Sequence, residues 1–174
     1  MQLSVDVVED AEVWHAFDTL IWGAEQFAPW VRAKVPITLE DLEDGVLFQE
    51  AVRALARLLR DGDTIVAHNA SFDLDMVLAR TAGRLRCESL AQQVLVKPRL
   101  CTMRCAYTRA ALGRQPSLKD LCRHFEVELE GAHDARADSA ALARGVAEAL
   151  RRGVLHGRLA TARHPPSCAP SSAR

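Results

Sequence analysis

Two short segments of the 174-residue chain combine a histidine with a carboxylate at a spacing that suits hydrolytic chemistry. The first, His68-Asn-Ala-Ser-Phe-Asp73, follows a short apolar run that is typical of a buried strand, and it places Asp73 at the start of a helix. The second, His133-Asp-Ala-Arg-Ala-Asp138, places a histidine before a long helix and a carboxylate in its second turn. A histidine beside a carboxylate can serve as a general base near a metal ion, and carboxylate oxygens suit Mg²⁺ or Mn²⁺.

Each segment alone also has a simple structural explanation. Asp73 could do no more than stabilise a helix N-terminus through the helix dipole. The spacing of His133 and Asp138 is common enough to arise by chance. The two segments therefore become informative only together with the elements that position them.

The elements expected around these segments alternate between strands and helices. Residues 2–8 and 12–21 predict two strands joined by a turn at Glu9 and Asp10, which makes a hairpin. A capping-box-like sequence at Thr38 predicts a helix that continues to about residue 59. Further along the chain we expect a strand at 64–67, helices opening at Ser71 and Ser117, a strand or loop at 127–129, and a long helix over 135–152. This order predicts an α/β fold, with a mixed sheet flanked by helices.

Charge is distributed unevenly along the chain, although the net charge is only −1. Residues 80–123 hold ten Lys or Arg against two Asp or Glu, a net charge of +8. Such a block is a candidate surface for contacting phosphates, and Arg99, Arg104 and Arg109 are its candidate nucleic-acid-binding residues. A solvated face with no partner is the alternative explanation.

Taken together and in this order, the segments AHNASFDLDMVL and GAHDARADSAALA resemble the second and third motifs of the DEDDh 3′–5′ exonucleases, a DnaQ-like family with a ribonuclease-H-like fold. The resemblance covers about residues 2–150, including the segments that begin at Pro98 and Ser117. It implies a two-metal mechanism that acts on the 3′ end of single-stranded DNA or RNA with two Mg²⁺ or Mn²⁺ ions. On this resemblance Asp73 and Asp138 are metal ligands and His133 is the general base.

The family's first motif, Asp-x-Glu on the first strand, is not found where the resemblance places it. Asp6-Val-Val-Glu9 has an offset of three, so its two acids face opposite sides of a strand. Asp10-Ala-Glu12 has the required offset but falls in the predicted turn, and Asp18 stands alone. The resemblance implies that the first strand lies centrally in the sheet, so its neighbours would lose a hydrogen-bonded partner. We therefore expect a fold that lacks its central strand and has little or no nuclease activity.

Two explanations for this missing strand remain open. Met1 is an internal methionine of a longer protein, or the chain is a degenerate and inactive relative. We expect an N-terminally truncated exonuclease domain over residues 1–155 and a Pro/Ser-rich disordered tail over 156–174. No apolar run approaches the ~20 residues that span a bilayer. The N-terminus also lacks the pattern of a signal peptide, which predicts an intracellular protein.

Two other classes of protein compete with the exonuclease. The same fold could serve as a catalytically dead module that binds nucleic acid or a partner protein. A structural zinc domain is the third hypothesis, since Cys101, Cys105, Cys122 and His124 could supply four ligands, although their spacing matches no common zinc motif. The odd number of cysteines fits free thiols in a reducing compartment. Neither the choice between DNA and RNA nor the oligomeric state is fixed by the sequence.

Overall fold

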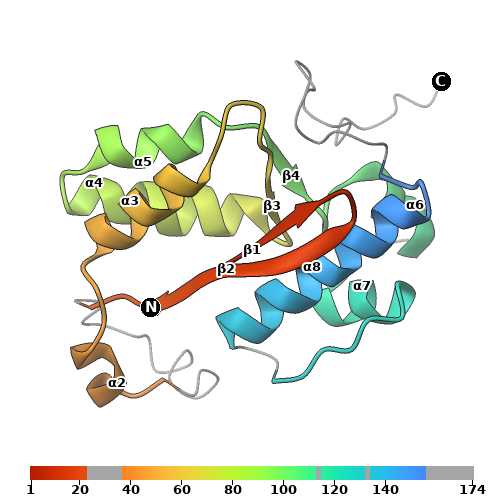
Figure 1. Ribbon diagram of the computed structural model, residues 1–174, viewed down its shortest axis with the longest axis horizontal. Coiled ribbons are helices and arrows are strands. Elements are labelled where there is room, and N and C mark those ends of the chain that lie inside the picture. The colour runs from red at the N-terminus through yellow and green to blue at the C-terminus, as the bar shows by residue number, and fades with distance from the viewer. Residues whose placement is uncertain (23–36, 113–114, 132–133, 156–174) are drawn as a thin grey trace.

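The computed structural model describes residues 1–22, 37–112, 115–131 and 134–155 (Figure 1). The predicted tail over 156–174 and residue His133 lie outside the described residues. The elements, in chain order, are β1 (Gln2–Glu9), β2 (Glu12–Leu20), α2 (Leu39–Glu43), α3 (Phe48–Leu58), β3 (Ile65–Ala67), the π-helix η1 (Ser71–Ala79), α4 (Arg80–Arg84), α5 (Glu88–Leu95), β4 (Arg99–Cys101), α6 (Ala106–Leu112), α7 (Leu118–His124) and α8 (Ala135–Arg151).

The predicted N-terminal hairpin is confirmed, with its turn one residue further along the chain. β1 and β2 pair antiparallel, and Asp10 and Ala11 form the turn with φ values of 53° and 64°. Two consecutive residues in this left-handed region are typical of the two-residue turns that match the twist of a hairpin. The register shifts between Val5 and Asp6, which leaves Ala16 of β2 without a partner as a β-bulge.

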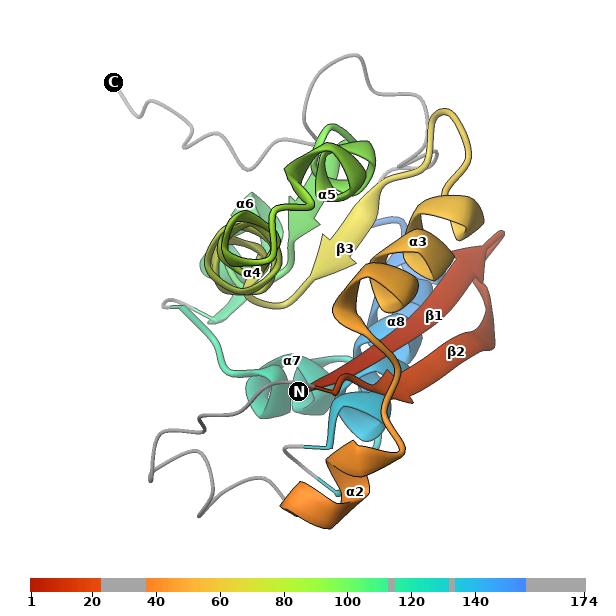
Figure 2. The same ribbon diagram turned by 90° about the vertical axis from the view of Figure 1, so that its left-hand side faces the viewer.

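The strands of the described residues form two small sheets. β1 and β2 make an antiparallel pair, and β3 and β4 make a parallel pair in which Ile65 lies opposite Arg99. Figure 2 shows β3 apart from the hairpin of β1 and β2. The mixed α/β fold that the sequence predicts is confirmed, but its strands do not join into one continuous sheet.

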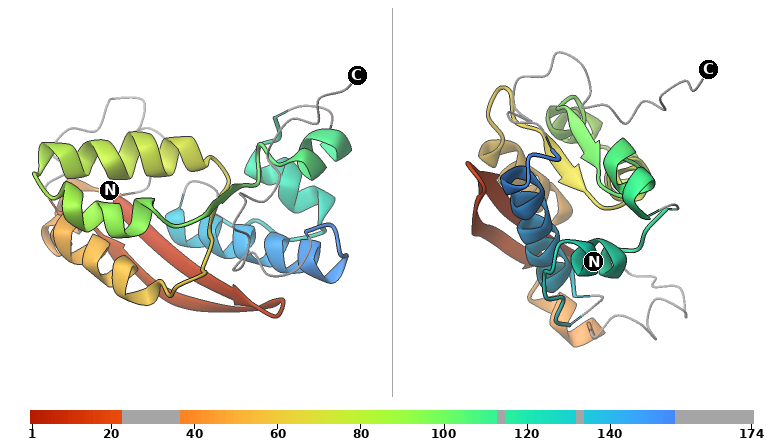
Figure 3. Two further views of the ribbon diagram at one scale, coloured as in Figure 1. Left: turned by 90° about the horizontal axis from the view of Figure 1, so that it is seen from above. Right: turned by 90° about the vertical axis from the view of Figure 1, so that its right-hand side faces the viewer.

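Helices cover both sheets and hold them in one molecule. α8 runs along the hairpin and packs mainly against β1, as the views in Figure 3 also show. α3, η1 and α5 enclose the main core, in which Phe48, Val52 and Val94 are buried. α7 packs against α8 around Leu121 and Phe125. Within the described residues no helix has both the length and the apolar character needed to cross a membrane.

The helix predicted from Thr38 to about residue 59 is interrupted, so that prediction is wrong in its middle. The capping box is confirmed, because Thr38 caps α2 together with Asp41, but α2 ends at Glu43. The chain then runs alongside the end of β2, where the N–H of Val46 donates to the carbonyl of Leu20 at 2.9 Å. This contact forces an extended segment between α2 and α3, which helical periodicity alone does not reveal.

Other local expectations are met to different degrees. The capping box at Ser117 and Asp120 is confirmed and begins α7, and the long C-terminal helix is confirmed as α8. Residues 127–129 form a loop. Ser71 begins a helix as expected, but its first nine residues follow π-helical geometry. The sequence did not predict α5 or α6, which lie in the basic stretch 80–123.

Candidate active site

Asp73 lies in the first turn of η1, just beyond the carboxyl end of β3. The backbone N–H groups of Phe72 and Asp73 both donate to the carbonyl of Asn69, which starts the π-helix. Single π-turns are frequent at functional sites because they re-aim side chains relative to an α-helix. Much of the residue is exposed, yet loss of water around the carboxyl group raises the pKa of Asp73, while a hydrogen bond from the backbone N–H of Asn69 acts to lower it.

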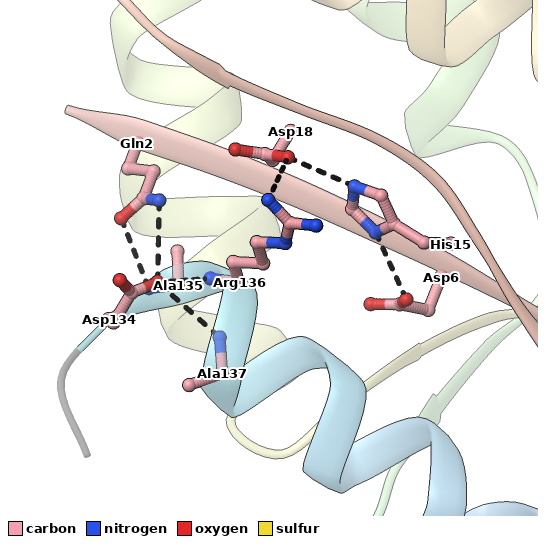
Figure 4. Close-up of polar contacts among 8 residues, drawn as sticks. All are labelled: Gln2, Asp6, His15, Asp18, Asp134, Ala135, Arg136 and Ala137. Atoms are coloured by element: carbon pink, nitrogen blue, oxygen red, sulfur yellow. Dashed lines mark hydrogen bonds and ion pairs between the residues drawn. The ribbon is translucent and has the colours of Figure 1, made fainter. Parts of the chain in front are cut away.

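Asp138 lies in the first turns of α8, and β1 fixes where that helix begins. Asp134 caps α8 by accepting hydrogen bonds from the N–H groups of Arg136 and Ala137 (Figure 4). Gln2 of β1 donates through Nε2 to Asp134 Oδ1 at 3.4 Å. Its Oε1 accepts a hydrogen bond from the backbone N–H of Ala135 at 3.1 Å. The first turn of α8 is therefore held on the hairpin, and Asp138 is partly buried four residues after the cap.

His68 directly follows β3, at the start of the segment that leads to Asp73. Its Nε2 donates to the carbonyl of Pro116 at 2.9 Å, and its Nδ1 contacts the hydroxyl of Thr102 at 3.0 Å. Burial lowers the pKa of His68, while the Pro116 hydrogen bond and the charges of nearby carboxylates, including Asp138, oppose that shift. Asp138 thus lies within electrostatic reach of the loop that leads from His68 to Asp73. The carboxyl end of a strand in an α/β sheet is a common position for ligands.

The partial burial of His68 leads to a prediction about stability. The folded state binds a proton at His68 less readily than the unfolded chain does, where imidazole titrates near ~6.5. The contribution of His68 to stability is therefore fully present above a pH of ~6.5 and is lost as the pH falls below that value. We expect the urea midpoint to fall from pH 7.5 to 5.5.

The matched variant is His68→Gln, which cannot take up a proton. It should lose about 1–3 kcal/mol at pH 7.5, because two hydrogen bonds of the partly buried ring are broken or weakened. Its urea midpoint should depend less on pH than that of the native chain. Equal pH profiles for the two proteins would contradict the role given to His68.

Of the remaining predicted site residues, the structure describes the three arginines but not His133. The relation of His133 to the two acids lies outside the described residues, so its role as general base stays a prediction. Arg99 on β4 donates to Asp75 of η1 at 2.6 Å and forms an ion pair with it. Arg104 follows β4 and Arg109 lies on α6, and both are exposed. The ion pair with Asp75 makes Arg99 a weaker candidate for a phosphate contact than the other two arginines.

Two of the acids considered as substitutes for the first motif, Asp6 and Asp18, pair with other side chains. Asp6 is buried on β1, with 4% of its side chain exposed, and its Oδ1 lies 3.1 Å from His15 Nδ1. His15 Nε2 lies 3.0 Å from Asp18, which also pairs with Arg136 of α8 at 3.6 Å. Figure 4 shows this network between the hairpin and the start of α8. The sequence did not predict it, although simple hairpin register already places His15 opposite Asp6.

No metal centre of three or more side chains is present in the described part of the chain. Across those residues, no group of three His, Cys, Asp or Glu side chains is arranged to hold an ion. Two of the residues proposed as zinc ligands have other contacts. Cys105 Sγ lies 3.2 Å from the hydroxyl of Thr108, and His124 Nε2 lies 2.8 Å from the hydroxyl of Tyr107. Burial raises the pKa of the Cys122 thiol, which disfavours the thiolate that zinc binds. The zinc hypothesis therefore gains no support.

A comparison with known families finds a match over most of the chain. The family model described as exonuclease, RNase_T, matches residues 4–145, which run from β1 into α8. Since this match covers most of the chain, the protein belongs to the exonuclease family. No curated protein matches the chain. Family membership supports a nuclease that acts on nucleic acid by hydrolysis.

Proposed function

We propose that this domain is a 3′–5′ exonuclease of the DEDDh type that shortens single-stranded DNA or RNA. Asp73 and Asp138 would hold divalent ions, and His133 would take the proton from the attacking water. What supports this most is that a chain of the exonuclease family carries Asp73 just beyond the carboxyl end of β3, and that the charge of Asp138 acts on the neighbouring His68. Two ions would supply activation of the water and stabilisation of the leaving oxygen.

The donors that the structure describes fit Mg²⁺ or Mn²⁺ in type but not in number. Carboxylate oxygens are hard ligands, and loss of water around Asp73 favours a nearby cation that would stabilise its charged form. Two ions held close together repel each other, and that repulsion requires more than two carboxylates to offset it. Asp6 is already engaged by His15, and Asp10 lies in the hairpin turn. We therefore propose that the first motif is missing and that the chain as it stands cleaves slowly at best.

The direct experiment follows a 5′-labelled single-stranded oligonucleotide, as DNA and as RNA, in Mg²⁺, in Mn²⁺ and in EDTA. We expect at most a slow loss of nucleotides from the 3′ end that requires the metal, is lost in Asp138→Asn, and is blocked by a 3′-phosphate. Internal cuts or shortening from the 5′ end would contradict the proposed polarity. Rapid cleavage by the native chain would confirm the function but show that the first-motif acids are present after all.

A second candidate is a catalytically inactive module of the same fold that binds nucleic acid. The specific observation in its favour is that the described residues hold no group of three metal-ligating side chains. Mn²⁺ titration separates the two candidates, because Asp73 and Asp138 in an exonuclease should bind the ion at least weakly. Oligonucleotide binding with neither cleavage nor Mn²⁺ binding would favour the inactive module.

Both candidates use the basic stretch, and its arginines make a prediction about salt. Binding of a single strand should weaken as salt rises, because each neutralised phosphate releases counterions. Charge reversal in Arg104→Glu or Arg109→Glu should weaken binding and lower the slope of log K against log salt by about 0.7 for each lost contact. Arg99→Glu should have the smallest effect of the three, because Arg99 already pairs with Asp75. Equal effects, or none, would contradict this assignment.

A further inference from the structure

A cavity of about 260 Å³ lies between α7 and the segment that follows this helix. In Figure 1 that segment runs back below α7 toward the start of α8. The cavity is just smaller than the ~300–1,000 Å³ typical of pockets for small ligands. Its lining combines two cationic side chains with two apolar ones and a thiol, namely Lys119, Arg123, Val127, Leu129 and Cys122. The cavity therefore has the size and the mixed chemistry of a site for one small charged molecule.

The way in which α7 ends fixes the second wall of the cavity. Glu126 has a φ of 59°, and the N–H of Val127 donates to the carbonyl of Cys122 at 2.8 Å. A left-handed residue followed by this hydrogen bond is the Schellman motif, which ends a helix. The carbonyl of Glu128 then accepts a hydrogen bond from the side chain of Arg144 on α8 at 2.9 Å. Both walls of the cavity are therefore held by contacts within the chain, before any ligand binds.

The cationic side chains make the lining complementary to an anion. Lys119 and Arg123 lie four residues apart, so they share one face of α7, and both are exposed. Arg123 makes an ion pair with Asp120 at a long distance of 3.7 Å, and 71% of its side chain stays exposed, which leaves donors available to a ligand. A phosphate group suits two such cations, because Arg can contact it through two parallel hydrogen bonds.

The apolar wall restricts which anion fits. Val127 and Leu129 are partly buried, whereas the residues that alternate with them, Glu126, Glu128 and Glu130, are exposed. The segment therefore turns its apolar side chains to the cavity and its acids to solvent. A phosphate attached to a flat, largely apolar group uses both parts of this lining, and inorganic phosphate uses only the cations.

We propose that this cavity binds a nucleoside 5′-monophosphate. The phosphate contacts Lys119 and Arg123. The base lies against Val127 and Leu129. The choice of ligand rests on the proposed function, in which water attacks the terminal phosphodiester and the bond to the 3′ oxygen of the shortened chain breaks. The released nucleotide then keeps the phosphate on its 5′ oxygen.

The cavity also lies within electrostatic reach of the proposed metal site. The charge of Asp138 acts on the thiol of Cys122 in the lining. Neither Asp73 nor Asp138 lines the cavity, so a nucleotide bound there does not need the metal ions. A released nucleotide would therefore be held beside the metal site without occupying it.

Equilibrium binding to the full 174-residue chain in EDTA tests this site without the catalytic metal. The probes are AMP, adenosine and ribose 5-phosphate. We expect saturable binding of AMP and roughly tenfold weaker binding of adenosine, which lacks the charge-assisted hydrogen bonds of the phosphate. Ribose 5-phosphate should also bind more weakly than AMP, because it lacks the base. No saturable binding of AMP, or equal affinity for ribose 5-phosphate, would overturn the proposal.

Charge reversal locates the bound nucleotide. Lys119→Glu and Arg123→Glu should each weaken AMP binding by roughly tenfold or more, because each replaces a phosphate contact by a repulsive charge. The matched control is Arg53→Glu on α3, which makes the same change at an exposed residue outside the lining and should bind AMP as the native chain does. Unaltered binding in both cavity variants, or an equal loss in the control, would overturn the assignment.

The outcome for this cavity and the outcome for the proposed function can be told apart. AMP binding that depends on Lys119 and Arg123, in a chain that cleaves no oligonucleotide under any metal condition, would support the cavity and remove the exonuclease activity. Metal-dependent cleavage by a chain that does not bind AMP in EDTA would overturn the cavity alone.

Discussion

Asp73→Asn is expected to abolish Mn²⁺ binding and, in the same protein, to raise the thermal midpoint in EDTA. The two effects have one cause. The carboxyl group is held where loss of water raises its pKa, so its charged form is less favoured in the folded chain than in the unfolded one. A cation at this position would reverse that disadvantage, which is why a metal ligand can lower the stability of the metal-free protein.

The sign of the pH dependence follows from the same shift. A carboxyl group whose folded pKa is raised contributes stability below its unfolded pKa of ~3.9, and that contribution is lost as the pH rises through the folded value. At neutral pH the charged Asp73 therefore opposes folding. Asn keeps the size of the side chain and removes the charge, so the thermal midpoint at pH 7 should rise. The native chain, but not Asp73→Asn, should be stabilised further by Mn²⁺.

The matched control is Asp75→Asn, two residues further along the same π-helix. Asp75 is exposed and pairs with Arg99, and an ion pair at a protein surface contributes roughly 0–1 kcal/mol. This variant should leave Mn²⁺ binding intact and lower the thermal midpoint slightly. Calorimetric titration with Mn²⁺ and thermal unfolding in EDTA measure both effects. Unchanged Mn²⁺ binding in Asp73→Asn would remove Asp73 from the metal site and weaken the exonuclease proposal.

The parts of the fold that the sequence predicts correctly are those decided by local chemistry. Thr38 with Asp41, and Ser117 with Asp120, satisfy the free N–H groups of a first helical turn within four residues, so the sequence alone indicates where these helices begin. The hairpin follows from alternation and a turn in the same way. The acids Asp73 and Asp138 were identified by resemblance, and their role as metal ligands stays a prediction.

The parts that could not be predicted depend on contacts between distant residues. Hairpin register pairs His15 with Asp6, but the bulge at Ala16 brings Asp18 onto the same face, and no local signal marks that bulge. The hydrogen bonds of His68 to Thr102 and Pro116 join segments that lie 34 and 48 residues away. A histidine in a suspected catalytic motif therefore proves to be part of the framework.

The break between α2 and α3 is the clearest such case, and it gives the second large prediction. Gly45→Ala is expected to destabilise the chain by about 1–3 kcal/mol, the usual cost of forcing an added group into a packed site. An added Cβ would lie 2.8 Å from the backbone nitrogen of Trp22 and 2.9 Å from the carbonyl oxygen of Leu20. Both atoms belong to the hydrogen bonds that join Val46 to the end of β2, so relief of the clash must break this connection.

Gly145→Ala is the matched control, because it makes the same chemical change with the opposite expected sign. Gly145 is buried in the middle of α8, and an added Cβ there would meet no atom within 4 Å beyond its chain neighbours and the nearby backbone of its own helix. Replacement of a helical Gly by Ala stabilises by about 0.5–1 kcal/mol, mainly because the unfolded chain loses conformational freedom. Urea unfolding of the two variants should therefore move the midpoint in opposite directions. A gain of stability in Gly45→Ala would mean that the connection between β2 and α3 tolerates a side chain, and that another feature of the sequence ends α2 at Glu43.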